Sequence, residues 1–203
     1  LLWEKDVRDQ LGNADWVSLK IDTVDHNIWK KMNKPHTSLR FEKILEGISD
    51  FSLSFKGDLT TETMLIQNVN DRIKSIENTA DFIAGLHPIK SYLSIPIRPP
   101  AETEVKPTSE TTINTAYQVF TKHGIDAEYL IGYEGNTFGF TGDIEENLLS
   151  IASVHPIRKE GVVEILKKAD EDWSVVEKLL YENKLIEVEY NKKKFYVRKF
   201  ERG

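Results

Sequence analysis

The stretch from residue 14 to residue 25, A-D-W-V-S-L-K-I-D-T-V-D, constrains the fold more than any other part of the sequence. Apolar and polar residues alternate along it with the two-residue period of a β-strand. The apolar side consists of Val17, Leu19 and Ile21, and the polar side consists of Ser18, Lys20 and Asp22. In a parallel barrel, helices cover the apolar outer side of each strand, and chemistry takes place at the carboxyl ends inside. We therefore expect Lys20 and Asp22 to face a lumen.

Strand and helix patterns alternate over the first two thirds of the chain. The strand patterns cover residues 14–25, 59–67, 89–97 and 125–133. Apolar residues with helical periodicity mark residues 2–11, 38–55, 75–86 and 109–122, and a shorter helix is expected at 26–32. Successive strands that are joined by helices form parallel sheets with right-handed crossovers. The sequence therefore predicts an α/β fold for residues 1–134.

The sequence changes character after residue 134. Three glycines within residues 135–142 indicate a connector, and Asp143 is expected to cap a helix. Two further helices and the two strands of a hairpin are predicted at residues 158–168, 172–183, 185–190 and 195–200. Three helices with a terminal hairpin predict a small winged-helix-like α+β domain over residues 143–203.

Composition excludes several classes of function. The 203 residues include no cysteine, which excludes disulfides, thiolate nucleophiles and a cysteine-ligated cluster in this polypeptide. The sequence has no run of about 18 apolar residues and no basic-then-apolar leader, so we expect a cytoplasmic protein without a membrane partner. The formal net charge of −6 provides no overall attraction for nucleic acid. The histidines lack metal-site spacing and no nucleophile motif occurs, so no catalytic residue or metal ligand is assigned.

Four segments, in order along the chain, carry a family resemblance. They are K-I-D-T-V-D-H-N-I-W-K-K-M-N-K-P-H (20–36), M-L-I-Q-N-V-N-D (64–71), I-R-P-P-A-E (97–102) and F-G-F-T-G-D (138–143). Together they resemble radical S-adenosylmethionine (SAM) enzymes, and most closely the prokaryotic Fe-S oxidoreductases related to the tRNA wybutosine-synthesising enzyme. The resemblance implies the back portion of a partial (β/α)6 barrel with parallel strands, followed by the winged-helix-like domain.

The resemblance also implies a chemistry. Enzymes of this family bind a [4Fe-4S] cluster with a C-x-x-x-C-x-x-C loop after the first strand, and reductive cleavage of SAM yields a 5'-deoxyadenosyl radical. This chain has none of those cysteines, so it looks like the carboxyl-terminal portion of such an enzyme, without the amino-terminal strands and the cluster loop. The intact parent would be an enzyme with SAM and [4Fe-4S] as cofactors, and this chain alone would be inactive. Its substrate and product are not indicated.

Six residues are candidates for binding SAM or substrate, namely Lys20, Asp22, Glu62, Asn70, Ser94 and Arg98. A lysine can pair with the SAM carboxylate, and an aspartate can accept a hydrogen bond from the SAM amine or ribose. The alternative is a salt bridge between Lys20 and Asp22 that only fills the barrel. Glu62 either points into the lumen, where a carboxylate needs a cation or a ligand, or points into solvent.

The other three candidates lie on the third predicted strand or in the loops that leave the second and third strands. The N-x-N-D loop with Asn70 resembles a loop that contacts the SAM ribose in related enzymes, although asparagine is also an ordinary turn former. Arg98 precedes two prolines and offers two parallel donors to a carboxylate or phosphate, and its alternative is a surface ion pair. Ser94 lies earlier on the same predicted strand.

Two expectations concern partners. The first strand of the predicted sheet would expose unpaired backbone groups along an edge, so we expect self-association through that edge. The terminal hairpin mixes basic and aromatic residues with glutamates, which leaves open either nucleic-acid contact or simple solubility. The alternative function is a cluster-free binding module whose winged-helix domain contacts tRNA or a protein partner. A small molecule and an RNA both remain open as substrates.

Overall fold

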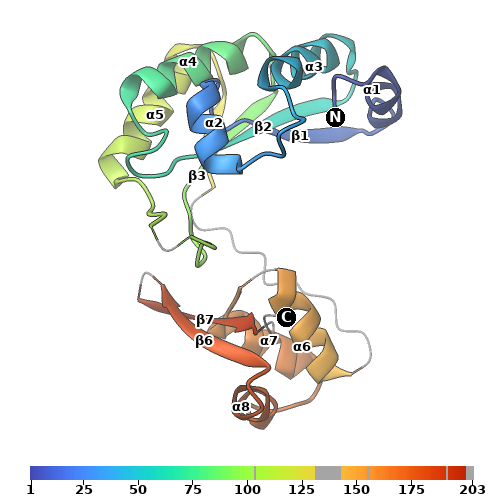
Figure 1. Cartoon of the computed structure of the whole chain (residues 1–203), viewed down its shortest axis with the longest axis vertical. Helices are drawn as coiled ribbons and strands as arrows, with labels where there is room; N and C mark the ends of the chain where they lie inside the picture. The colour runs from blue at the N-terminus through green and yellow to red at the C-terminus, as the bar shows by residue number, and fades with distance from the viewer. Residues whose placement is uncertain (103, 131–142, 155, 191, 200–203) are drawn as a thin grey trace. The chain divides into compact units, whose positions relative to one another are not determined.

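The chain divides by its internal contacts into two compact units (Figure 1). The computed structural model describes residues 1–102, 104–130, 143–154, 156–190 and 192–199. The first unit comprises Leu1–Pro96 and Glu104–Ile131, and the second comprises Ile97–Thr103 and Gly132–Gly203. This division differs from a single boundary at residue 134, because residues 97–103 group with the second unit. The predicted connector at residues 135–142 lies outside the described residues.

Helices and strands alternate in the first unit, as the sequence patterns predict. In chain order, its elements are α1 (Lys5–Leu11), β1 (Trp16–Lys20), α2 (His26–Asn33), α3 (Phe41–Ser54), β2 (Asp58–Met64), α4 (Ile73–Ala84), β3 (Lys90–Ser94), α5 (Glu110–Lys122) and β4 (Ala127–Tyr129). The strands are shorter than predicted. In β3 the reason is visible, since Pro96 has no backbone N–H with which to extend the ladder.

The four strands form one parallel sheet in the order β1-β2-β3-β4. The register places Lys20 opposite Glu62, and Glu62 opposite Tyr92. Because parallel strands end at the same edge of a sheet, this register brings the carboxyl ends of β1, β2 and β3 together. Among the described residues, β1 has a neighbouring strand on one side only, so the predicted open edge exists. Self-association through it stays a prediction.

The two faces of this sheet differ in chemistry. Helices α3, α4 and α5 gather on one face (Figure 1), where they pack with the strands into one apolar core. That core includes Val17, Leu19, Ile21, Phe51, Leu59, Ile83, Leu93 and Phe120. The alternation predicted for β1 is confirmed, because Val17 and Leu19 are buried whereas Ser18 and Lys20 are exposed. Burial of the apolar side thus aims the polar side of β1 away from the helices.

Helix α3 begins at Phe41, three residues after the predicted start at Ser38. A serine caps a helix when its hydroxyl accepts a hydrogen bond from a backbone N–H two or three residues on. Here the Ser38 hydroxyl lies 2.8 Å from Nδ1 of His36, and Nδ1 also accepts a hydrogen bond from the Ser38 backbone N–H. Ser38 therefore belongs to a local turn, and Arg40 occupies the cap position without a side-chain cap bond.

Within its described residues, the second unit contains three helices and a three-stranded antiparallel sheet in the order β5-β7-β6. Its elements are α6 (Ile144–Val154), β5 (Ile157–Arg158), α7 (Lys159–Lys168), α8 (Ser174–Tyr181), β6 (Leu185–Tyr190) and β7 (Lys193–Arg198). The cap predicted at Asp143 is confirmed, since its carboxylate accepts hydrogen bonds from the backbone N–H groups of Glu145 and Glu146. Strand β5 was not predicted, because two residues are too short to display a period.

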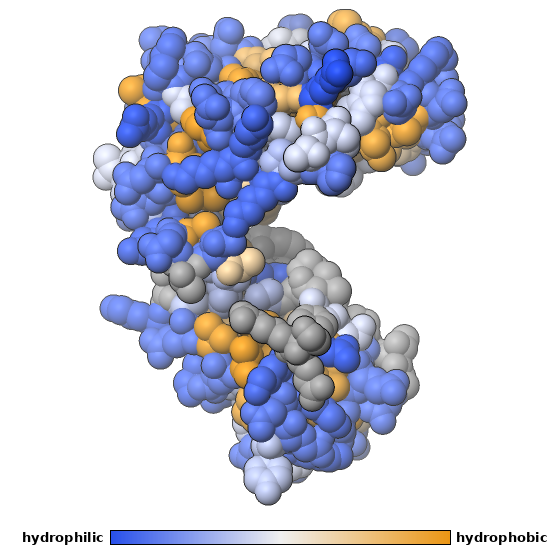
Figure 2. All heavy atoms as spheres, viewed as in Figure 1, coloured by the Kyte–Doolittle hydropathy of each residue, from blue (hydrophilic) through white to orange (hydrophobic). Residues whose placement is uncertain are grey.

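Hydrophilic side chains dominate the face of the molecule that Figure 2 displays, with apolar residues visible between them. In the part of the chain that the structure describes, no helix combines the length and the apolar character needed to cross a bilayer.

Candidate functional site

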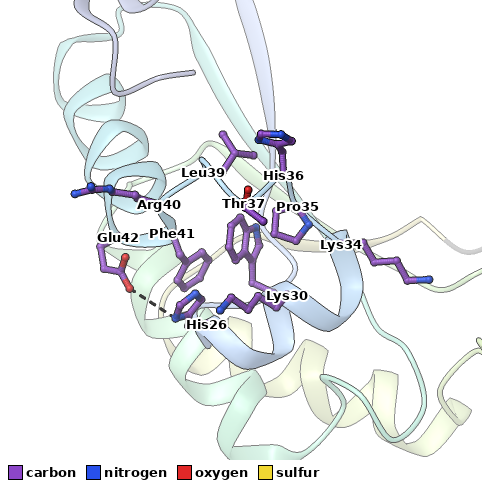
Figure 3. A pocket seen from close by; sticks show the side chains of 11 residues that line it. His26, Lys30, Lys34, Pro35, His36, Thr37, Leu39, Arg40, Phe41 and Glu42 are labelled. Atoms are coloured by element: carbon purple, nitrogen blue, oxygen red, sulfur yellow. Dashed lines mark ion pairs between the residues drawn. The ribbon is translucent and has the colours of Figure 1, made fainter.

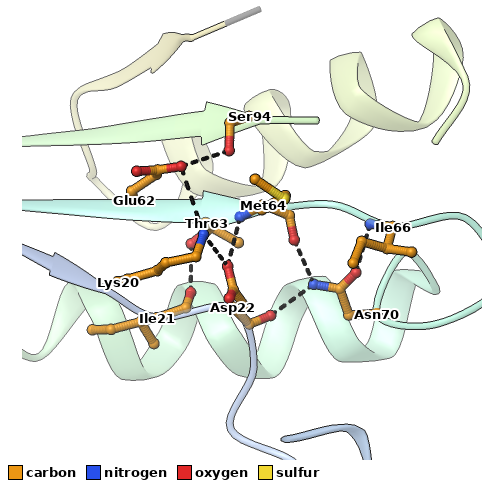
Figure 4. Close-up of polar contacts among 9 residues, drawn as sticks. All are labelled: Lys20, Ile21, Asp22, Glu62, Thr63, Met64, Ile66, Asn70 and Ser94. Carbon is orange, nitrogen blue, oxygen red and sulfur yellow. Dashed lines mark hydrogen bonds and ion pairs between the residues drawn. The ribbon is translucent and has the colours of Figure 1, made fainter. Parts of the chain in front are cut away.

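The polar face of the first unit carries a cluster of charged side chains at the carboxyl end of β1 (Figure 4). Lys20 Nζ lies 3.1 Å from Asp22 Oδ1 and 3.6 Å from Glu62 Oε1. The Asp22 side chain is only 7% exposed, whereas that of Lys20 is 48% exposed. The lysine therefore links a buried carboxylate to a partly exposed one, and its ammonium remains accessible from solvent.

Strands β2 and β3 complete the cluster. Ser94 lies at the end of β3, and its hydroxyl donates a 2.9 Å hydrogen bond to Glu62 Oε1. Glu62 thus points toward the cluster from the middle strand, and not into solvent on the helical face (Figure 4). One cation, two carboxylates and one hydroxyl converge here, which gives both donors and acceptors for a zwitterionic ligand.

Asn70 lies beside this cluster, in the loop after β2, and joins the ends of β1 and β2 (Figure 4). Its Nδ2 donates to the backbone carbonyls of Asp22 and Met64, each at 2.8 Å, and its Oδ1 accepts from Ile66 N–H at 2.8 Å. The residue is 1% exposed. These bonds use both amide protons, so in this structure Asn70 fixes the strand ends that carry Asp22. Its contact with a ribose stays a prediction.

The sequence did not predict two further hydrogen bonds around the cluster. Thr63 donates from its hydroxyl to the carbonyl of Ile21 at 2.7 Å. The Asp22 carboxylate accepts a 2.8 Å hydrogen bond from the backbone N–H of Met64. Backbone partners follow from strand register, and no residue pattern in a single segment reveals them. The T-x-T alternation in β2 was the one local sign that hydroxyls line the strand.

The candidate Arg98 and the first residue of the N-x-N-D loop, Asn68, lie outside the cluster. Arg98 is half-buried in residues 97–103, which group with the second unit, and its role stays a prediction. Asn68 is exposed and has a φ of 57°, which suits a turn residue. Its backbone N–H donates to Asp71, whose other oxygen accepts from the Thr108 hydroxyl. These two hydrogen bonds therefore hold the loop after β2 in place.

Burial governs the electrostatics of Asp22. Removal from water raises the pKa of the Asp22 carboxyl above its ordinary value, and the neighbouring Lys20 charge and the Met64 N–H oppose this rise without cancelling it. The Glu62 charge adds to the rise. A second positive charge next to the Asp22 carboxylate would offset part of the free-energy cost of its burial. This position therefore favours a cationic group of a ligand.

Asp22→Asn is expected to change how stability depends on pH. A folded-state pKa above the ordinary 3.8 means that the folded chain binds this proton more tightly than the unfolded chain does. The stability that protonated Asp22 contributes is therefore complete below that value and is lost as pH rises through the folded pKa. Asparagine retains an acceptor for Met64 N–H and does not titrate.

Urea unfolding of both proteins between about pH 3 and pH 7 measures this effect. Relative to Asp22→Asn, the wild type should lose free energy of unfolding as pH rises. Asp81→Asn, at an exposed position of α4, serves as the matched control and should follow the wild type. Parallel curves for wild type and Asp22→Asn would show that burial does not raise the pKa of this carboxyl.

The cluster has no capacity for an iron–sulfur cofactor. Such clusters require soft thiolate ligands, and the chain contains no cysteine. Among the described residues, no group of three or more histidine, aspartate or glutamate side chains is arranged to hold a metal ion. The donor set suits an organic ligand with a carboxylate, an ammonium or hydroxyls.

This chain resembles radical SAM domains in fold over about two thirds of its length. It is similar to a domain of pyruvate-formate lyase-activating enzyme from Bacteroides vulgatus, with a TM-score of 0.52 and 23% sequence identity over 64% of this chain and 76% of that chain. It is also similar to a radical SAM methyltransferase from Sphaerobacter thermophilus, with a TM-score of 0.51 and 17% identity over 66% of this chain and 39% of the other. These likenesses concern the fold.

Sequence comparison leads to proteins named UPF0026. A UPF0026 protein of Methanocaldococcus jannaschii is 42% identical over 200 residues, which are 98% of this chain and 62% of that protein. The chain thus spans less than two thirds of the length of this relative. No protein-family profile matches the chain.

Proposed function

We propose that this chain forms the SAM-facing carboxyl-terminal part of a radical SAM enzyme whose cluster cysteines lie outside these 203 residues. The observation that carries the proposal is the convergence of Lys20, Asp22, Glu62 and Ser94 at the carboxyl ends of parallel strands. Ligands of open parallel sheets and barrels bind at that end of the strands. The fold likeness to radical SAM domains supports the same reading.

In this proposal, each residue of the cluster has a different role in binding SAM. The accessible ammonium of Lys20 would pair with the SAM carboxylate. The carboxylates of Asp22 and Glu62 would accept hydrogen bonds from the SAM amine or the ribose hydroxyls, and Ser94 would hold the Glu62 carboxylate in place. In the intact enzyme, the cluster and SAM would supply radical chemistry once an external donor provides one electron. The chain itself contributes binding and orientation.

The finer family assignment belongs to this proposal. Kinship with the prokaryotic Fe-S oxidoreductases related to the tRNA wybutosine-synthesising enzyme rests on the motifs at residues 20–36, 64–71, 97–102 and 138–143. The winged-helix assignment of the second unit rests on its three helices and three-stranded sheet. The terminal hairpin gives less support to a nucleic-acid module, because Lys194 pairs with Glu187 at 2.7 Å and Tyr196 donates to the same carboxylate.

Lys20→Gln in the full-length, cluster-loaded enzyme is expected to raise the KM for SAM by about tenfold with little change in kcat. The reason is that the lysine would contribute one charge-assisted hydrogen bond to a bound carboxylate, and this bond is the same in the ground and transition states. SAM cleavage driven by dithionite, followed as 5'-deoxyadenosine released, measures both constants.

Lys90→Gln is the matched control for this experiment. Lys90 is the first residue of β3, and Ser94 is the last. The Lys90 ammonium lies 2.7 Å from the Glu128 carboxylate. It carries the same charge as Lys20 at the amino end of the strands, so its loss should leave the KM for SAM within about twofold. Equal KM values for the two variants would exclude Lys20 as a SAM ligand.

A further inference from the structure

The charges of this chain are unevenly distributed along the sequence. Residues 26–43, which form α2 and the start of α3, contain five lysines and arginines and one acidic residue, although the whole chain carries a formal charge of −6. The five cations are all exposed, and they are Lys30, Lys31, Lys34, Arg40 and Lys43. We call residues 26–43 the basic surface. A local excess of positive charge on an acidic protein attracts a polyanion to that place.

The carboxylates of the chain neutralise little of this charge. Among the described residues, four of the five cations form no ion pair, namely Lys30, Lys31, Arg40 and Lys43. The acidic residue of the segment, Glu42, has its Oε1 3.9 Å from Nδ1 of His26. In the second unit, by contrast, the ammonium groups of Lys178 and Lys184 lie 2.6 and 2.7 Å from glutamate oxygens. The basic surface therefore keeps charge that an external anion can meet.

The fold joins the cations of the two helices into one surface. Lys34 ends α2 with a φ of 43°, and this left-handed residue turns the chain back toward α3. The rings of Trp29 on α2 and Phe41 on α3 then pack with their centroids 4.9 Å apart. As a result, Lys30, Lys34 and Arg40 line the same concavity of about 580 Å³ (Figure 3).

The directions of these three side chains decide what kind of anion fits. Figure 3 shows Arg40 and Lys34 extending outward in opposite directions, with Lys30 between them in this view. They do not converge, so one phosphate or one carboxylate cannot engage all three. A linear polyanion can, because each of its charged groups meets a different cation.

We propose that a single strand of nucleic acid docks on the basic surface through its phosphates, with Arg40, Lys30 and Lys34 each beside a different phosphate. Every phosphate of such a strand carries a negative charge, and its neutralisation by lysine or arginine releases a bound counterion. A flexible strand can bend to follow cations that diverge. A duplex is stiff over about 50 nm, so it presents straight rows of phosphates that suit this surface less well.

Two other polyanions fit the surface less well. Peripheral membrane helices insert an exposed apolar face into lipid, whereas Trp29 and Phe41 are only 9% and 4% exposed here. Of the large apolar side chains in this segment, only Leu39 is exposed. An acidic protein would also need an apolar centre for its interface. Interfaces with nucleic acid are more polar and more positively charged, as this surface is.

The proposal is independent of the proposed SAM site. Docking of a strand requires neither SAM nor an iron–sulfur cluster, and it uses none of the residues of the Lys20 cluster. Failure of one proposal would therefore leave the other untouched.

Fluorescence polarisation with a labelled oligouridylate of about twelve nucleotides tests the proposal on the 203-residue chain. We expect a Kd of about 10–100 µM in about 50 mM salt. A plot of log K against log salt concentration should have a slope of about −2 to −3.5, which corresponds to about three to five phosphate contacts on a single strand. The triple variant Lys30→Gln, Lys34→Gln, Arg40→Gln should bind at least about tenfold more weakly and should reduce the slope by about 2.

The matched control is Lys56→Gln, Lys74→Gln, Lys122→Gln. These lysines are exposed in the first unit, lie outside the basic surface, and remove the same total charge. The control should retain the wild-type slope and an affinity within about twofold of the wild type. Thermal unfolding verifies that each variant stays folded. Equal losses in the two triple variants, an unchanged slope in the first variant, or no binding at about 500 µM protein would overturn the proposal.

Further probes test the kind of polyanion. Oligoadenylate and a DNA strand of the same length should bind within about threefold of oligouridylate, because phosphates supply the contacts. A preference above about tenfold for one base or one sugar would contradict docking through phosphates. Tighter binding of a duplex would contradict the single strand. Equal competition by polyglutamate, or sedimentation with phosphatidylserine vesicles that the first triple variant loses, would assign the surface to an acidic protein or a membrane and overturn the proposal.

Discussion

Anaerobic reconstitution of the 203-residue chain with iron and sulfide is expected to give no [4Fe-4S] absorption and no 5'-deoxyadenosine from SAM. Thiolates hold such clusters, and the carboxylate and imidazole groups of this chain are poor replacements for so soft a site. The Lys20 cluster can at most bind SAM weakly. The expected effect on activity is therefore complete loss.

A longer protein that includes the proposed cluster cysteines supplies the comparison, and we expect it to give both signals under the same conditions. The chain covers 62% of the length of the relative from Methanocaldococcus jannaschii. Dithionite-driven release of 5'-deoxyadenosine is the deciding measurement. Product from the short chain would refute the need for an external cluster. A well-folded, cluster-loaded full-length protein without product would refute the radical SAM assignment.

Asn70→Ala should lower the free energy of unfolding by about 3 kcal/mol. The substitution removes three hydrogen bonds of 2.8 Å from a site that is 1% exposed. Buried backbone groups that lose a partner cost about 1–3 kcal/mol each, although neighbouring groups recover part of this. Urea unfolding gives the value directly.

Two further variants make the Asn70 prediction sharp. Asn70→Asp keeps the shape of the side chain but turns an acceptor toward the carbonyls of Asp22 and Met64, so it should destabilise the chain at least as much. Asn78→Ala, an exposed substitution of the same kind on α4, should remain within about 0.5 kcal/mol of the wild type. Wild-type stability of Asn70→Asp would mean that these hydrogen bonds do not hold the strand ends together.

The nearby Asp22 should then respond to the loss of Asn70. Asn70 Nδ2 holds the Asp22 carbonyl, and the Asp22 carboxylate accepts from Met64 N–H. Both contacts fix the same residue between β1 and β2. A variant that loosens the strand ends would therefore also weaken the orientation of Lys20, which lies two residues before Asp22.

Much of the first unit was predictable because local residue patterns indicate its helices and strands. Strand β1 buries one face, so polar and apolar residues alternate along it, and the helices repeat their apolar residues every three to four positions. Asp143 and Ser109 cap their helices as short polar side chains do. The exceptions have local causes as well. Ser38 bonds to His36 and not to the helix, and β5 is only two residues long.

The candidate site was predictable in membership and not in geometry. Lys20, Asp22, Glu62 and Ser94 could be selected because each is polar and lies within a strand pattern. Their distances depend on the register of β1, β2 and β3, which joins residues more than 30 positions apart. Asn70 shows the limit most clearly, since its type suits a turn equally well, and only burial reveals that it binds the ends of two strands.

The sequence by itself determined the α/β order of the first unit, the polar side of β1 and the impossibility of a thiolate-bound cluster, since these depend on residue type and short-range spacing. The tertiary structure alone decided the rest. Packing of α3, α4 and α5 on one face set the strand register, and the register brought Lys20 to Glu62 and removed Asp22 from water. The tertiary structure also brings Phe41 against His26, because the turn at Lys34 folds the chain back. Desolvation and ring contacts depend on such neighbours.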